Sequence, residues 1–428
     1  MTLRVLLAAV LASLWGPPAW SQYSQYSPPG QGALSEETAS KEERLRTALS
    51  EARWRLGPVR LSPWLGVKQV GYVDNAFGSA EDPRSDFTAT AGAGLHGYLP
   101  LGRKTVVAAH ALPEYVWWRD LENRRLWNWN YGVGVFGFFN RLSLEATAGS
   151  LRAEEPLNSE VEAPVNIRRD RVAAALELRL HERMSLFGAG GWTEVRYRDE
   201  DVERLGGTLP LRFLDRDEER FSGGLRYHWR PNVTLSGGVE SSRVDFLADD
   251  RDRSNRGTSP LAELAVSGQR FQASARVVWA RIDPTTGSEM PPYRATLGSF
   301  GVGFTPGARL TWRVYGGRNL VYAYSEDIAA YTEDRVGLGL SLPVGWRTVL
   351  GVFSERGHRR TETGSEVLLG RGDSATHGAT ATFLVRGQTR LAVRGSRTTY
   401  DGMGTIPRTS ITRVHVTLGL AAGVSEWW

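Results

Sequence analysis

The chain has 428 residues, of which 41% are hydrophobic and 23% charged, and its formal net charge at pH 7 is +5. Beyond the first twenty residues no apolar run reaches ~18 residues, which excludes a helical membrane protein. Cysteine is absent, which excludes disulfides and thiolate metal sites. The composition that remains favours an all-β chain whose hydrophobicity is spread thinly.

The N-terminal residues have the pattern of a secretion signal. Arg4 precedes an apolar stretch from Val5 to Leu14, and Gly16-Pro17-Pro18 separates that stretch from the small residues Ala19 and Ser21. A short basic region, an apolar region and small residues at the cleavage site are the parts of a signal peptide. We predict that residues 1–21 are removed and that the mature protein lies outside the cytoplasm.

Residues 22–57 are expected to form a linker and one amphipathic helix. The segment Gln22–Gly32 is rich in Tyr, Ser, Gln, Pro and Gly, as flexible linkers are. From Ser35 to Leu56 apolar residues recur at helical spacing, and Ser40 with Glu43 forms a capping box. Because one helix cannot bury its apolar stripe alone, it should contact a periplasmic partner, plug the structure formed by the remaining chain, or pack on its rim.

From Val59 onward apolar and polar residues alternate at a two-residue period, which is the period of a β-strand. About eight short Gly, Pro, Asn or Arg turns alternate with about nine longer charged links, as short periplasmic turns and longer outer loops do in transmembrane barrels. We therefore predict that residues 58–428 form one closed antiparallel transmembrane β-barrel of about 18 strands (16 to 18). Such a barrel would lie in the outer membrane of a Gram-negative bacterium.

The last fifteen residues show the alternation clearly. A tilted strand of about 9 to 11 residues crosses a bilayer, and a terminal aromatic residue suits the interface. We expect the barrel-assembly machinery to recognise this strand, although the last strand of a soluble sandwich would alternate in the same way. The residues that share the apolar parity are Val414, Val416, Leu418, Leu420, Ala422, Val424 and Trp428.

Four apolar stripes are assigned to the lipid-facing side, and the charged residues of the opposite parity are assigned to the lumen. The stripes are Phe87, Ala89, Ala91, Ala93 and Leu95; Phe187, Ala189, Val195 and Tyr197; Phe271, Ala273, Ala275, Val277 and Trp279; and Leu310, Trp312 and Val314. An arginine that faces lipid at mid-bilayer costs about 2 to 4 kcal/mol. The predicted pore-lining residues are Arg169, Arg171, Glu177, Arg179, Glu194, Arg220, Arg226, Glu240, Glu263, Arg276, Arg309, Arg313, Arg335 and Arg347. They either favour anion passage or pair with one another and rigidify the wall.

The first predicted hairpin carries a resemblance to a known group. The segment Gly71-Tyr72-Val73-Asp74-Asn75-Ala76-Phe77 and the segment from Ser85 to Gly102 resemble the opening of the outer-membrane β-barrel porin type 2 group. Members of that group are commonly associated with exopolysaccharide export. The resemblance implies a polysaccharide conduit that would need a separate periplasmic polysaccharide-export protein, because no helical repeats precede the barrel. The predicted helix is the candidate docking or gating element.

Three functions remain open at this point. The favoured one is a conduit for exopolysaccharide across the outer membrane; the alternatives are a general or anion-selective porin for small solutes and a non-conducting adhesin or structural barrel. Outer-membrane lipid and lipopolysaccharide are expected partners, and nucleic acid is not. No cofactor, metal or catalytic residue is assigned, because Ser374 and His377 beside Asp373 have opposite parity and the acidic loop clusters are interleaved with arginine.

Overall fold

The computed structural model describes the chain from Lys41 to Leu420 with several gaps. The residues outside the description are 1–40, 77–81, 156–164, 198–201, 205–206, 210, 249–252, 269, 286, 289, 291, 308–309, 324–328, 362–371, 387–388, 402–408 and 421–428. The predicted signal peptide, Ser40 and the C-terminal Trp428 therefore lie outside the described residues.

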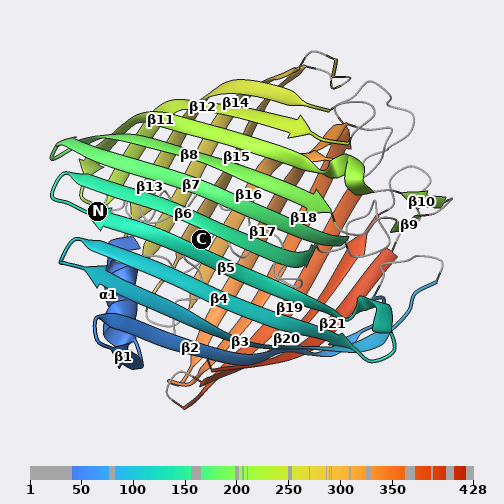
Figure 1. Cartoon of the computed structure of the whole chain (residues 1–428). Coiled ribbons are helices and arrows are strands. Elements are labelled where there is room, and N and C mark those ends of the chain that lie inside the picture. The colour runs from blue at the N-terminus through green and yellow to red at the C-terminus, as the bar shows by residue number, and fades with distance from the viewer. Residues whose placement is uncertain are drawn as a thin grey trace.

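Eighteen long antiparallel strands form one sheet in the described part of the chain (Figure 1). Each strand pairs with the next along the chain, and β2 also pairs with β21, so that the sheet closes on itself. The strands are β2 (Val59–Val73), β3 (Asp86–Leu101), β4 (Thr105–Trp118), β5 (Leu126–Phe138), β6 (Leu142–Glu155), β7 (Val165–His181), β8 (Met184–Tyr197), β11 (Arg216–Arg230), β12 (Val233–Phe246), β13 (Asn255–Ser267), β14 (Phe271–Pro284), β15 (Tyr293–Phe304), β16 (Thr311–Tyr322), β17 (Ala330–Val344), β18 (Thr348–Thr361), β19 (Gly372–Arg386), β20 (Thr389–Tyr400) and β21 (Thr409–Leu420). The predicted closed all-β barrel is confirmed.

Short elements lie at the two ends of the barrel. The three-residue strand β1 (Trp54–Leu56) pairs with the start of β2 at the end where the short turns lie. At the other end, the long links contain the hairpin β9 (Val202–Arg204) and β10 (Gly207–Leu209) and the 3-10 helices η3 (Glu122–Arg124) and η4 (Leu211–Leu214). Short turns at one end and long loops at the other are the arrangement that the sequence predicts.

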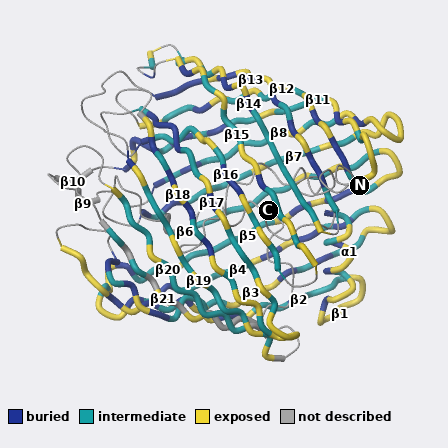
Figure 2. The backbone as a smooth tube through the Cα atoms, turned by 180° about the vertical axis from the view of Figure 1, so that it is seen from behind, coloured by how far each residue is buried: buried dark blue, intermediate teal, exposed yellow. Residues whose placement is uncertain are grey.

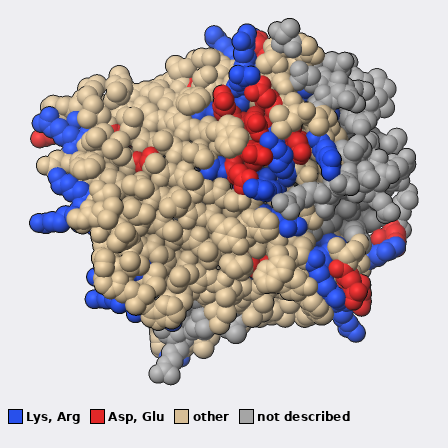
Figure 3. Space-filling model, viewed as in Figure 1, with Lys and Arg blue, Asp and Glu red and all other residues tan. Residues whose placement is uncertain are grey.

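The outer face of the barrel is apolar. Large hydrophobic side chains in the middle of strands are about half exposed, among them Val172 (53%), Leu225 (48%) and Val239 (49%). Figure 3 shows a broad uncharged band on the face in view, with charged side chains at its two ends. A soluble protein would bury such residues, whereas hydrocarbon solvates them. We define this band as the apolar belt.

Three of the four predicted lipid-facing stripes lie on the outer face, and the stripe on β8 does not. The register pairs Phe187 with Glu177 and Val195 with Arg169, so these β8 residues share the face of the charged residues of β7. The outward-facing residues of β8 are instead the even-numbered ones, which include Leu186 and Trp192. The prediction was wrong here because apolar residues occupy both faces of β8, and only pairing with its neighbours decides which face is inside.

The predicted helix is present and shorter than expected. Helix α1 spans Lys41–Glu51, and Leu56 belongs to β1 instead. Leu45 is fully buried and packs with Ala48 against the inner faces of β3, β4 and β5, where it contacts Tyr98 and Phe136. The helix therefore buries its apolar stripe on the inner wall, near the short turns (Figure 1). Within the described ranges, no helix has the length and hydropathy to cross a membrane.

The apolar belt predicts how the two faces of one strand pair respond to a charge. Val239→Arg would place a guanidinium in hydrocarbon and should lower the free energy of unfolding of the barrel in lipid vesicles by about 2 to 4 kcal/mol. Ser222→Arg, on the inner face opposite Glu240, is the matched control and should change it by less than about 1 kcal/mol. Urea titrations of folded protein in vesicles measure both values. Equal losses would contradict the assignment of the faces.

Candidate functional site in the barrel lumen

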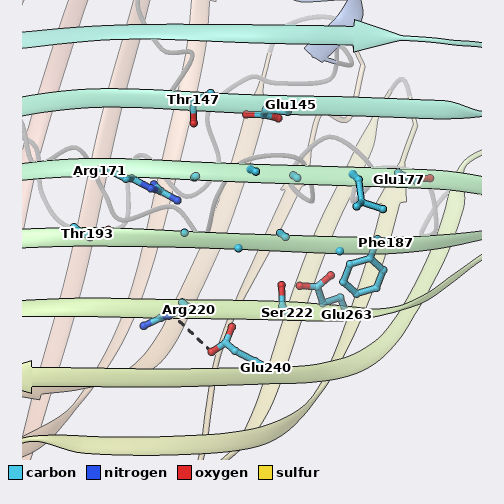
Figure 4. Close-up of a pocket in the computed structure, with 18 of the residues that line it drawn as sticks. Glu145, Thr147, Arg171, Glu177, Phe187, Thr193, Arg220, Ser222, Glu240 and Glu263 are labelled. Carbon is cyan, nitrogen blue, oxygen red and sulfur yellow. Dashed lines mark ion pairs between the residues drawn. The ribbon is translucent and has the colours of Figure 1, made fainter.

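A cavity of about 140 Å³ lies against the inner wall between β6 and β14 (Figure 4). It exists because the inner residues of β7 and β8 are small there: Ala173, Ala175, Ala189 and Gly191 leave space that larger side chains would fill. Longer charged side chains surround this floor. They are four arginines and five glutamates, namely Arg171, Arg220, Arg226, Arg276, Glu145, Glu177, Glu218, Glu240 and Glu263.

Glu177 and Arg226 form a buried ion pair at one side of the cavity. The Arg226 guanidinium donates to the Glu177 carboxylate, and Ser185 Oγ donates to the same carboxylate at 2.6 Å. The guanidinium also lies 5.1 Å from the centre of the Phe187 ring. Because both charges are largely shielded from water, each depends on the other for stabilisation.

Arg276 joins three neighbouring strands at the other side of the cavity. Its guanidinium lies 2.5 Å from Glu240 Oε2 on β12 and 3.0 Å from Glu263 Oε1 on β13. Arg220 on β11 approaches Glu240 at 4.0 Å, as the dashed line in Figure 4 marks. One glutamate thus serves two arginines, and the charged side chains form a continuous network across the wall.

The remaining two glutamates are neutralised from outside the cavity lining. Glu218 is paired with buried Arg216 at 2.8 Å, and Glu145 is paired with Lys41 of α1. All five glutamates of the lining therefore have a basic partner. Arg171 differs, because among the described residues it makes no hydrogen bond or ion pair. Its side chain extends from β7 beside Thr193, its cross-strand neighbour.

A second network lies on the opposite wall, because β18 is half-way round the ring from β7. Glu333 binds Arg335 at 2.7 Å and Arg359 at 3.1 Å. Tyr315 Oη donates to Glu355 at 2.9 Å. Arg394 lies 4.9 Å from the centre of the Phe353 ring. Both walls of the lumen therefore carry arginine and glutamate in contact, and on the opposite wall the arginines outnumber the carboxylates.

Most of the predicted pore-lining residues lie on inner faces, and two do not. Those around the cavity are Arg171, Glu177, Arg220, Arg226, Glu240, Glu263 and Arg276. Those on the same inner faces further along the strands or on the opposite wall are Arg169, Arg179, Arg313 and Arg335. Glu194 lies on the outer face of β8, where it pairs with Arg196 at 3.0 Å. Arg347 lies in the exposed turn between β17 and β18, and Arg309 is outside the described residues.

The lumen also contains charged residues that sequence reasoning missed. Glu218 belongs to one of the acidic clusters that the sequence assigns to loops, yet it shares the parity of Arg216 and Arg220 on β11, and this shared parity is the signal that could have found it. The partnership of Lys41 with Glu145 spans 104 positions of sequence. No local sequence pattern predicts a contact between residues so far apart in the sequence.

Ser374, His377 and Asp373 do not converge on one face of the barrel wall. Ser374 and His377 lie on opposite faces of β19, and Asp373 is bonded to His358 on the outer face at 2.5 Å. In the part of the chain that is described, no group of three His, Asp or Glu residues could hold a metal ion.

Comparisons with known proteins identify the fold. The chain matches no protein-family model and no curated protein. Pseudomonas aeruginosa OccK2 (OpdF) is similar at 10% identity and a TM-score of 0.51, over 84% of this chain and 97% of that one. OccK2 in complex with glucuronate gives 10% identity, a TM-score of 0.50 and the same coverage. Acinetobacter baumannii OccAB3 gives 12% identity and a TM-score of 0.48, over 84% and 98%.

The two OccK2 structures support the fold of an outer-membrane β-barrel porin and do not support the resemblance to the exopolysaccharide-export group. At such identity the likeness concerns the fold alone. It agrees with the apolar belt and with the predicted location in the outer membrane of a Gram-negative bacterium. The chain has the fold of an outer-membrane β-barrel porin.

Removal of one partner of the buried pair Glu177–Arg226 should destabilise the barrel, and removal of the second charge as well should restore most of the stability. Arg226→Met leaves the carboxylate without its counter-charge and should destabilise the barrel by about 3 kcal/mol. Adding Glu177→Gln should recover most of that loss. Arg294→Met, which removes an exposed partner of Asp283, is the control and should cost less than about 1 kcal/mol. Unfolding titrations measure the stability of each variant. If Arg226→Met alone is as stable as the parent, the pairing is contradicted.

Proposed function

We propose that the protein is an outer-membrane channel that passes small anionic solutes. Arg171 carries this proposal, because it is a lumenal arginine that forms no hydrogen bond or ion pair with the described residues, and the nearby Glu145 and Glu218 are each bound to another basic group. A fixed positive charge that faces an aqueous passage lowers the energy of an anion there and raises that of a cation. Arginine also offers a planar set of donors that fits carboxylate and phosphate groups.

The numbers of basic and acidic residues on the two walls also favour the passage of anions. The cavity with its immediate partners contains six basic residues and five glutamates, that is, Lys41, Arg171, Arg216, Arg220, Arg226 and Arg276 against Glu145, Glu177, Glu218, Glu240 and Glu263. The opposite wall contains four arginines and two glutamates, that is, Arg313, Arg335, Arg359 and Arg394 against Glu333 and Glu355. An excess of one sign along a passage with low-dielectric walls focuses the potential and concentrates the opposite ion.

The structural relatives support a small solute rather than a polymer. OccK2 has been seen with glucuronate, a sugar that carries a carboxylate. Helix α1 occupies part of the lumen near the short turns, where a polysaccharide would have to enter. Small carboxylated solutes are therefore the substrate class that we favour over exopolysaccharide.

The central prediction concerns ion preference in planar bilayers. Arg171→Gln should lower the chloride-to-potassium permeability ratio by a factor of about five, the effect of losing ~1 kcal/mol of attraction in water. Arg171→Lys keeps the charge and should retain most of the ratio. Arg294→Gln lies outside the lumen and is the control. Reversal potentials across a salt gradient measure all four proteins, and an unchanged ratio in Arg171→Gln would refute the role of this residue.

The same recordings distinguish the other functions. A protein that never conducts, with or without α1, would support a closed adhesin or structural barrel. Loss of surface polysaccharide in a strain that lacks the protein, with intact uptake of small anions, would support the exporter.

The packing of α1 on the inner wall leads to a separate prediction about conductance. Leu45→Glu places a carboxylate among Tyr98, Phe136 and Ala48, where an unpaired charge is strongly unfavourable. The helix should leave the wall, and single-channel conductance should rise above that of the parent. Ser50→Glu, on the exposed side of α1, should leave conductance unchanged. Identical conductance in the two variants would mean that α1 does not narrow the passage.

A further inference from the structure

Basic residues occupy the short turns at one mouth of the barrel. Seven exposed basic side chains lie in or beside these turns, and Glu182 is the single acidic residue in their described part. Among the described residues, none of the six arginines forms an ion pair. We define this set as the basic rim; it consists of Arg103, Lys104, Arg141, Arg183, Arg230, Arg270 and Arg347.

The basic rim follows directly on the apolar belt. Leu101, Leu180 and Val344 are outward-facing residues that are 51%, 52% and 48% exposed, and each lies within three positions of a rim residue. Since a strand rises ~3.3 Å per residue, the rim charges lie within about 10 Å of the edge of the belt. The headgroup layer of each leaflet is about 5 to 8 Å thick. The rim is therefore level with lipid headgroups.

Aromatic side chains place the interface at the same level. Trp346 is 76% exposed and its ring centre lies 3.8 Å from the Arg347 guanidinium. Trp229 is 46% exposed and lies 5.6 Å from the guanidinium of Arg230. Tryptophan prefers the boundary between hydrocarbon and headgroups. An arginine that stacks on such a ring is held where a headgroup phosphate would be.

The other end of the barrel does not share this imbalance. There acidic side chains are mixed with the basic ones, and three outer-face arginines have carboxylate partners: Arg243 with Asp245 at 2.9 Å, Arg294 with Asp283 at 2.5 Å and Arg318 with Asp334 at 2.5 Å. In Figure 3 the charged side chains at the short-turn end are almost all basic, whereas those at the loop end are mixed. The exposed turns themselves are visible from behind in Figure 2.

We propose that the basic rim binds the phosphate-bearing headgroups of anionic phospholipids, such as phosphatidylglycerol, in the leaflet that surrounds the short turns. Unpaired arginine offers bidentate donors to phosphate, and basic groups next to a bilayer attract anionic lipid. Continuity with the apolar belt favours a lipid over an acidic protein, because a protein that covered the rim would have to displace the headgroups beside it.

The test uses the folded full chain in bilayers of phosphatidylcholine that contain increasing amounts of brominated phosphatidylglycerol. Quenching of tryptophan fluorescence reports which lipid surrounds the barrel, and Trp229 and Trp346 lie at the rim. We expect about a fivefold preference for the anionic lipid, the factor that one basic residue beside an anionic surface provides. The preference should fall in about 0.5 M salt, which screens exposed charges.

A rim variant with Arg103→Gln, Arg141→Gln, Arg183→Gln and Arg230→Gln keeps three of the seven rim charges and should lose most of the preference. The matched control changes the same number of arginines at the loop end, with Arg119→Gln, Arg243→Gln, Arg294→Gln and Arg318→Gln, and should keep the preference. Heat-modifiable migration on gels verifies that both variants are folded. The proposal is overturned if the parent shows no preference, if the rim variant keeps it, or if the control loses it equally.

Discussion

The hydrogen bonds between β2 and β21 are the constraint on which the remaining structure depends. They join the first and last long strands of the barrel, so that no strand of the described ring has an unpaired edge. In hydrocarbon an unpaired backbone group costs several kcal/mol, and water is not present to satisfy it. Closure therefore allows this sheet to lie in lipid, and it also creates an interior that is separated from the lipid.

Closure assigns opposite chemistry to alternate residues. Outward residues such as Val172 and Val239 remain exposed because lipid solvates them, and inward residues include the arginines and glutamates of the lumen. Small inward residues on β7 and β8 leave the cavity open, while the long side chains around it bind one another across neighbouring strands. Arg276 shows the principle, since it contacts Glu240 and Glu263 on two different strands.

Charge is distributed differently in three zones of the molecule. In the lumen, carboxylates are neutralised and a small basic excess remains, with Arg171 as its clearest member. On the outer face near the loops, several arginines pair with carboxylates of the same or an adjacent strand. Around the short turns, the basic residues of the described ranges form no ion pair. The lumen faces an aqueous passage, the outer face near the loops lies at one side of the membrane, and the short turns lie at the headgroups of the other leaflet. The ratio of basic to acidic residues therefore differs with the environment of each zone.

The sequence by itself determined the barrel, the strand number and the lumenal position of residues such as Arg171 and Arg276. It could do so because lipid on one side of a strand imposes a two-residue period over the whole membrane span. The two-residue period did not show which face of β8 is inside, because Phe187 and Leu186 are both apolar and suit either face. The register with β7 places Phe187 on the inner face and Glu194 on the outer face. The period also did not show that Arg347 falls in a turn.

Only the tertiary structure decided which charges meet. Lys41 neutralises Glu145 from α1, and the lumenal arginines divide the glutamates among adjacent strands. These partnerships depend on strand stagger and on where α1 docks, which no local pattern records. Arg171 forms no ion pair with the described residues because the neighbouring Glu145 and Glu218 are bound to Lys41 and Arg216.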